Sequence, residues 1–209
     1  MQQRPYGDFE FERRFFVNEF PEKYSNGASV EVIVQSYYVA KDGYNLRVRA
    51  TAKGLRIEMN EKTSFEQVLN DNYAAFTECT VTIKGPMNAG TRYEAEREVD
   101  PSVAIELIKA DGHRIIKNRY SVWIGNDGWA VDEFGAENYP LIIAECERLS
   151  PVTDLQIPAF CVTEITENWD FANDALSIES YKSFSQAFLD DIQVNGPKFL
   201  KGFGNDQHI

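Results

Sequence analysis

The sequence contains few of the residues on which several common catalytic sites depend. Its 209 residues include only two histidines, His113 and His208, and three cysteines at wide, unpatterned spacings. Two histidines are too few to favour a Ser-His or Cys-His nucleophilic site or a histidine-rich zinc site. An odd number of cysteines predicts neither a disulfide framework nor a thiolate metal site. We expect any catalytic site to be built from carboxylates, Lys, Arg and Tyr.

Positive charge and long apolar segments are also scarce. Lys and Arg number 21 against 33 Asp and Glu, which gives a net charge of −12 and argues against a nucleic-acid or anionic-membrane partner. No apolar run approaches the roughly 20 residues that span a bilayer, and residues 1–12 are polar where a signal peptide is apolar. The hydrophobic fraction of 43% excludes a disordered chain. We therefore expect a soluble, cytoplasmic, globular protein.

Most of the chain alternates apolar and polar residues with the period of two that is typical of strands. The predicted strands are 9–17, 30–40, 44–50, 79–84, 91–99, 115–124, 129–134 and 141–149. Eight strands are enough to close a barrel. The sequence therefore predicts a mainly β (α+β) fold, an eight-stranded antiparallel β-barrel with covering helices.

Helices are predicted at three places. A hydroxyl cap in Thr63-Ser64, followed by Gln67, opens an amphipathic stretch to Phe76, and Asp100 followed by Pro101 opens another that ends at Gly112. These two helices are expected to pack on the barrel wall. A third amphipathic stretch, 181–192, precedes a tail that we expect to be loosely held. We assign residues 1–176 to the barrel domain and 177–209 to a C-terminal helix and tail that pack on it or extend from it.

The polar positions of the strands are mostly full charges, and they segregate by sign. Acid pairs occur at 10/12, 94/96 and 145/147, and base pairs at 47/49 and 117/119. One interpretation is an ordinary solvated sheet face. The alternative is a covered cavity in which acid pairs hold cations and base pairs hold a polyanion. Because like charges at i and i+2 gain nothing on an exposed strand, we favour the cavity.

The ordered set of motifs resembles the CYTH superfamily, the triphosphate tunnel metalloenzymes. The opening strand is Glu10-Phe11-Glu12-Arg13-Arg14-Phe15, similar to the Glu-x-Glu-x-Lys opening of that family. The resemblance continues through Arg47-Val48-Arg49, Thr82-Ile83-Lys84, Arg92-x-Glu94-x-Glu96, Lys117-Asn118-Arg119-Tyr120, Val131-Asp132, Glu145-Cys146-Glu147 and Val162-Thr163-Glu164. It covers about residues 8–176.

The resemblance implies a barrel whose tunnel binds a linear triphosphate with Mg²⁺ or Mn²⁺. The implied metal ligands are Glu10, Glu12, Asp132, Glu145 and Glu147. The implied substrate-binding residues are Arg14, Arg47, Arg49, Lys84, Arg92, Lys117 and Arg119. The implied catalytic residues are Lys84, Lys117, Arg14, Tyr37, Glu94 and Glu96. Hard oxygen ligands of this kind suit Mg²⁺ or Mn²⁺.

The activity that this resemblance implies is hydrolysis of a triphosphate, with inorganic tripolyphosphate cleaved to pyrophosphate and phosphate. Class IV adenylate cyclase, thiamine triphosphatase and a non-enzymatic triphosphate sensor remain alternatives. A monomer or a homodimer is expected.

Two departures from the family pattern bear on the site. Arg14 stands where the family usually has Lys, and an arginine is a poor proton acceptor beside Tyr37. The segment between Arg49 and Lys84 is longer than in small members, so its helix could also lid one tunnel mouth.

Overall fold

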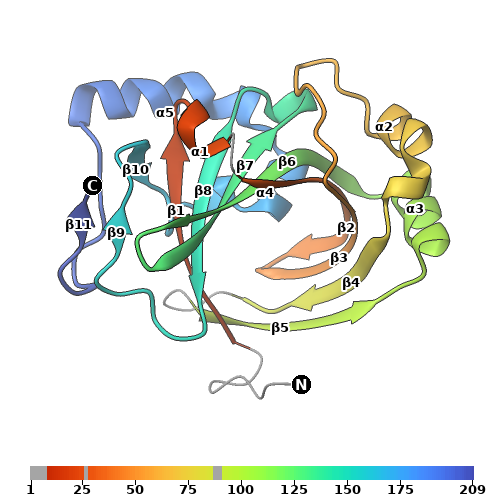
Figure 1. The fold of residues 1–209 in the computed structure, drawn as a ribbon, viewed down its shortest axis with the longest axis horizontal. Coiled ribbons are helices and arrows are strands. Elements are labelled where there is room, and N and C mark those ends of the chain that lie inside the picture. Colours follow the sequence, from red (N-terminus) through yellow and green to blue (C-terminus); the bar gives the residue numbers. More distant parts are fainter. Residues whose placement is uncertain (1–8, 26–27, 87–90) are drawn as a thin grey trace.

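One large antiparallel sheet dominates the computed structural model, which describes residues 9–25, 28–86 and 91–209 (Figure 1). Its strands are β1 (Phe9–Val17), β2 (Ser29–Lys41), β3 (Tyr44–Lys53), β4 (Glu78–Lys84), β5 (Thr91–Glu98), β6 (His113–Ile124), β7 (Asp127–Phe134), β8 (Ile142–Arg148) and β10 (Cys161–Glu164). A short parallel pair, β9 (Gln156–Ile157) and β11 (Gln207–His208), lies apart from it. The predicted mainly β fold with antiparallel strands and added helices is confirmed.

The strand order is β10-β1-β5-β4-β3-β2-β6-β7-β8, and β1 pairs with β8 as well. The N-terminal part of β1 pairs with β5, and its residues 11–17 pair with β8. All eight predicted strands are present with bounds close to those expected. The sheet has nine strands rather than eight because Cys161–Glu164 pairs with the end of β1.

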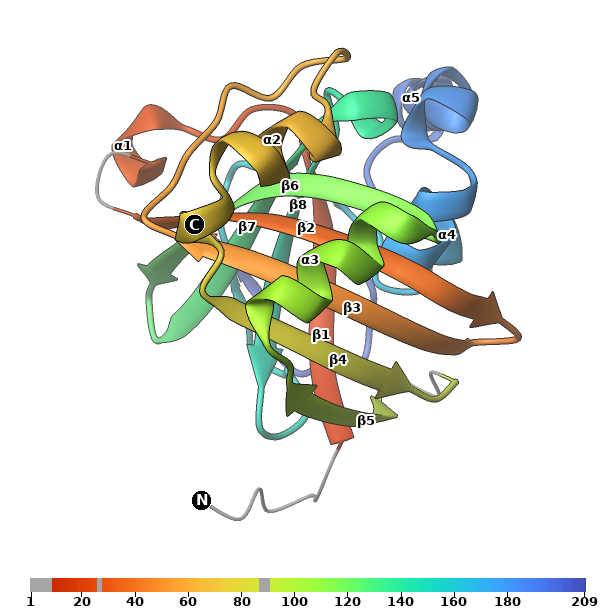
Figure 2. The same ribbon diagram turned by 90° about the vertical axis from the view of Figure 1, so that its right-hand side faces the viewer.

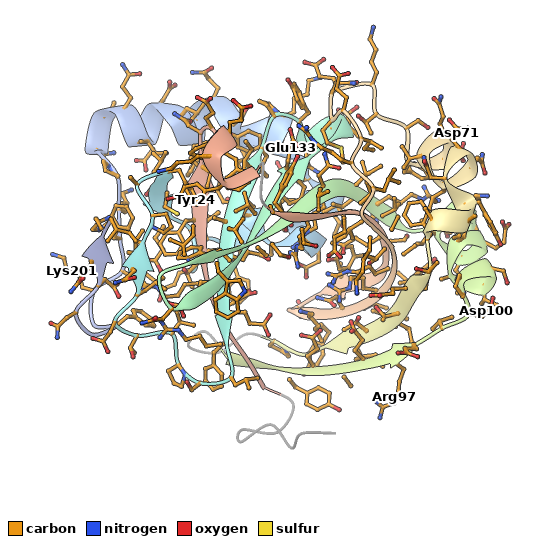
Figure 3. The ribbon with its side chains drawn as sticks, in the orientation of Figure 1. Tyr24, Asp71, Arg97, Asp100, Glu133 and Lys201 are labelled. Atoms are coloured by element: carbon orange, nitrogen blue, oxygen red, sulfur yellow. The ribbon has the colours of Figure 1, made fainter. Side chains whose placement is uncertain are left out.

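Two of the helices, α2 (Phe65–Asp71) and α3 (Pro101–Ala110), lie on the outer side of β2, β3 and β4 (Figure 2). Figure 3 shows Asp71 and Asp100 at their ends, on the outside of the molecule. Ser64 caps α2 and Asp100 caps α3, as predicted. The two helices bury Leu69, Ile105 and neighbouring side chains against the outer face of the strands. The wall-cover prediction is therefore confirmed.

The segment predicted as one helix, 63–76, differs in the structure in one respect. It is divided into α2 and a 3₁₀ turn, Tyr73–Ala75, and both pack on the sheet exterior. None of its described residues lines the central pocket, so the hypothesis of a lid over a tunnel mouth is not supported. Its apolar face is already packed against the strands beneath it.

The C-terminal third adds α4 (Asn173–Ile178) and α5 (Tyr181–Asn195), and a short α1 (Glu22–Ser25) follows β1. Helix α4 contacts β2 and β6, and Figure 1 shows it behind the strands. An apolar cluster that includes Phe16, Phe171 and Leu176 fills this region. Apolar side chains on one side of α5 pack against it. Every helix in the described ranges is too short or too polar to cross a bilayer.

The tail after α5 is held in place, contrary to expectation. Asp206 accepts a hydrogen bond at 2.7 Å from Arg13, whose side chain is 1% exposed and also pairs with Glu164. The backbone of β11 pairs with β9, and the nitrogen of Leu200 donates to Glu164. Sequence composition suggested a loose end because glycines are frequent there, but these glycines occupy turns with positive φ.

Substituting alanine for Gly112 is expected to destabilise the protein by about 1–3 kcal/mol. Gly112 joins α3 to β6 with φ +97°, and an added Cβ would come within 2.9 Å of the Tyr37 carbonyl oxygen and closer still to Ser36 Oγ. Gly54 is a matched control, since its φ is +73° but its surroundings are open. Urea unfolding should show a larger loss for Gly112→Ala than for Gly54→Ala, and equal losses would contradict the steric argument.

Candidate functional site

A pocket of about 950 Å³ lies against the inner face of the sheet. Ligand pockets are commonly of this size, up to about 1,000 Å³. The predicted site residues that line it are Glu12, Arg14, Tyr37, Arg47, Arg49, Lys84, Glu94, Glu96, Arg119, Glu145 and Glu147. They come from β1, β2, β3, β4, β5, β6 and β8, and they meet here because the period of two turns every second side chain inward. The predicted charged cavity is thus present.

The two ends of the pocket differ in what surrounds them. We call the end covered by α4 the rear, and the opposite end, beside the turn between β6 and β7, the front. Asn45 donates to Asp174 of α4 at 3.3 Å at the rear. Trp123, at the end of β6, lines the front and is 79% exposed.

Three arginines, Arg47, Arg49 and Arg119, line the pocket. Burial and the like charges of Arg47 and Arg119 together lower the pKa of Arg49 to about 10. Arg49 Nε donates to Gln35 Oε1 at 3.1 Å, and Gln35 Nε2 donates to Tyr37 at 3.0 Å. Mutually repelling cations held in a pocket form a site for a polyanion, whose binding relieves the repulsion.

Two glutamates of β5 contact the basic side chains. Glu94 lies 2.9 Å from Lys84 Nζ, and Glu96 lies 3.3 Å from an Arg47 nitrogen. Burial raises the pKa of Glu96, but a hydrogen bond from Thr82 and the charge of Arg47 outweigh burial and lower it overall. The contacts of these two glutamates therefore orient Arg47 and Lys84 toward the pocket.

Arg14, which was expected to bind phosphate, donates to backbone carbonyl oxygens in the structure. Its side chain is 5% exposed, and its guanidinium donates to the carbonyl oxygens of Phe171 and Thr166, each at 3.1 Å. Its Nε is 3.7 Å from Glu12 and has no hydrogen-bond partner among the described residues. Most of its donors thus hold the chain before α4, which a lysine ammonium could not do with the same planar fork.

Lys117 and Asp132 are fully buried and do not line the pocket. Lys117 Nζ donates to Asp132 and to Asn173, and Arg119 donates to both oxygens of Asp132. Burial lowers the pKa of Lys117 to about 8, although Asp132 opposes this. Burial likewise opposes ionisation of Asp132, but Arg119 and Lys117 hold its pKa well below its ordinary value.

This placement differs from the prediction that Lys117 contacts substrate and Asp132 a metal. The alternation correctly predicts that both side chains point inward. It does not predict how far along the pocket each side chain lies. In this structure the pair fixes the position of Arg119, which does line the pocket.

The remaining carboxylates of the pocket come from β1 and β8. Glu12 lies directly across from Glu147 in the strand register, and Arg14 lies across from Glu145. Facing glutamates disfavour each other on neighbouring strands, and a cation between them removes that cost. These oxygen donors fit Mg²⁺ or Mn²⁺ in kind. Among the side chains that the structure describes, no three of His, Cys, Asp or Glu form a cluster that could hold a metal ion.

Two predicted site residues lie outside this description. Only the backbones of Glu10 and Arg92 are described, and they are register partners between β1 and β5. Sequence reasoning also missed Asn45, which shares the inward face of β3 with Arg47 and could have been found by its spacing. It missed Asn173 and Asp174 because their place depends on how α4 folds back.

Comparison with known proteins gives one curated relative of significant similarity. An inorganic triphosphatase of Acetivibrio thermocellus is 31% identical over 108 residues, which are 51% of this chain and 69% of that protein. Two crystal structures of NE1496, one described as an inorganic triphosphatase, match with a TM-score of 0.54 at 24% identity. They cover 81% of this chain and 98% and 95% of theirs, and they support the same fold. No protein-family model matches the chain.

Proposed function

Because this chain belongs to the CYTH superfamily, we propose that it hydrolyses a triphosphate, with inorganic tripolyphosphate cleaved to pyrophosphate and phosphate. The observation that carries the proposal is the cluster of Arg47, Arg49 and Arg119 in a pocket that also contains facing glutamates. The relative from Acetivibrio thermocellus is an inorganic triphosphatase by name, which favours the same substrate. We further propose that β1 to β8 act as the wall of a tunnel, since β1 pairs with both β5 and β8.

The basic side chains are assigned to phosphate binding. Arg47, Arg49 and Arg119 present planar forks that match phosphate oxygens, and Lys84 supplies a point charge. Glu94, Glu96 and Asp132 fix these cations by direct contacts, so little reorganisation is needed when a substrate binds. Preorganised donors of this kind stabilise the charge that spreads over the oxygens during phosphoryl transfer.

A divalent ion is part of the proposal. Glu12, Glu145 and Glu147 would hold it after their side chains move closer together, because the described acidic side chains form no three-residue metal cluster as they stand. When bound, Mg²⁺ or Mn²⁺ neutralises phosphate oxygens and helps to orient the attacking water. Glu145 also accepts a hydrogen bond from Arg119 at 2.7 Å, which places a cation beside the carboxylate group and ties the two halves of the site together.

The test is a substrate panel on the purified chain. Tripolyphosphate, ATP, thiamine triphosphate and pyrophosphate are each incubated with Mg²⁺ or Mn²⁺, and phosphate, pyrophosphate and cyclic AMP are measured. We expect phosphate and pyrophosphate from tripolyphosphate, and loss of this activity after chelation. Cyclic AMP from ATP would instead identify a cyclase. Thermal stabilisation by tripolyphosphate without product would identify a binding protein.

A further inference from the structure

The inner face of the sheet changes from charged to apolar toward the rear of the pocket. Each of four strands carries an apolar inward side chain at its rear end: Phe16, Ile115, Phe134 and Ile143. All four are at most 4% exposed. They belong to one apolar cluster with Phe171 and Leu176, which are also buried. The rear is therefore closed by packed apolar side chains, which lie beside the buried polar groups Arg14, Asn45 and Lys117.

Polar side chains hold the chain segment 166–178 over this rear end. Arg14 donates to the carbonyl oxygens of Thr166 and Phe171. The side chain of Asn173 accepts from Lys117 at 3.0 Å, and that of Asp174 accepts from Asn45. Three inward-facing side chains from β1, β3 and β6 thus anchor the segment on different sides.

Exposure falls along the pocket in the same direction. Trp123 at the front is 79% exposed, and Glu147, Ser29 and Ser121 are exposed as well. Arg47, Lys84 and Asn45, which lie toward the rear, are each at most 5% exposed. The nitrogen Nε of Arg47 is buried and has no hydrogen-bond partner among the described residues. The deep part of the pocket therefore offers cationic donors to a group that arrives from the front.

We propose that the segment 166–178 is a stop that closes the rear of the pocket, so that a substrate must present a free terminal phosphoryl group. This inference rests on the proposed triphosphate substrate. The free end reaches Lys84 and Arg47, and the opposite end lies toward the front, where an organic group is tolerated. A triphosphate with organic groups at both ends does not fit, because the buried rear supplies neither space nor solvent for the second group.

Binding of three compounds to the full chain tests the stop. Tripolyphosphate, ATP and P1,P3-di(adenosine) triphosphate are titrated by calorimetry in the same Mg²⁺ buffer. We expect ATP, which has one free end, to bind at least tenfold more tightly than the doubly capped compound. The inference is overturned if the doubly capped compound binds within tenfold of ATP, or if tripolyphosphate binds and ATP does not. Since binding is measured, failure of hydrolysis does not affect the result.

A second measurement tests whether Arg14 positions the stop. Hydrogen exchange of the 166–178 amides is compared in the wild type, Arg14→Gln, Arg14→Lys and Arg47→Gln. Arg47 is the matched control, because it is equally buried but contacts Thr82 and the β5 glutamates instead. We expect at least tenfold faster exchange in Arg14→Gln, partial rescue in Arg14→Lys and no change in Arg47→Gln. Equal exchange in all four proteins would exclude the positioning role.

Discussion

Replacing Arg49 by glutamine is expected to lower kcat/KM for tripolyphosphate by about 10²- to 10³-fold, the effect of losing one preorganised donor. The same change is expected to raise Tm. Burial and the nearby charges of Arg47 and Arg119 lower the pKa of Arg49 to about 10, so the folded state disfavours its charge at neutral pH. Removing that charge stabilises the fold and removes a phosphate ligand, a trade often found at functional sites.

Arg148→Gln is the control for this experiment. Arg148 lies at the end of β8 and donates to both oxygens of Asp127 and to the Thr153 carbonyl. It does not line the pocket. We expect Arg148→Gln to lower Tm and to keep kcat/KM within about twofold, because it breaks a part-buried ion pair that lies outside the pocket. Near-normal turnover of the Arg49→Gln protein would refute the phosphate-binding role of Arg49.

Replacing Arg13 by methionine is expected to lower the free energy of unfolding by about 3–5 kcal/mol, the cost of breaking a buried ion pair from one side. Arg13 and Glu164 are each 1% exposed and are joined by two hydrogen bonds at 2.8 and 2.7 Å. Loss of Arg13 leaves Glu164 without its partner and releases Asp206 of the tail. For a chain of this size the loss corresponds to a fall in Tm of roughly 6–20 °C.

Differential scanning calorimetry is the measurement, and the matched control is an exposed ion pair between the tail and α5. Lys198 contacts Asp191 at 2.7 Å, but the two side chains are 65% and 45% exposed. Lys198→Met should therefore change Tm little, since exposed pairs contribute little. A fall in Tm as large as that of Arg13→Met would show that tail docking in general, rather than the buried pair, determines stability.

Much of the fold could be predicted from alternation alone. The charges at Glu12, Arg47 and Glu145 lie inward because successive strand residues point to opposite faces, and this rule holds wherever both faces are covered. The caps at Ser64 and Asp100 mark helix starts for equally local reasons. These features require no knowledge of which strands are neighbours.

The parts that were not predicted depend on contacts between distant residues. Lys117 was expected to line the pocket, but it donates to Asp132 and to Asn173 instead, and Asn173 is 56 residues away in sequence. Arg14 was expected on phosphate, but the carbonyl oxygens it contacts belong to residues more than 150 positions later. A pattern with a period of two contains no information on such pairs.

The position of β1 has a consequence for how the chain acquires its structure. This first strand pairs with β5, β8 and β10, and its Arg13 contacts Asp206 near the end of the sequence. Most of its partners are synthesised long after it, so the pairing has high contact order and is expected to form late and slowly. Until β8 and β10 are made, β1 has an unpaired edge that can recruit other strands. Expression at low temperature or with a chaperone should therefore raise the soluble yield.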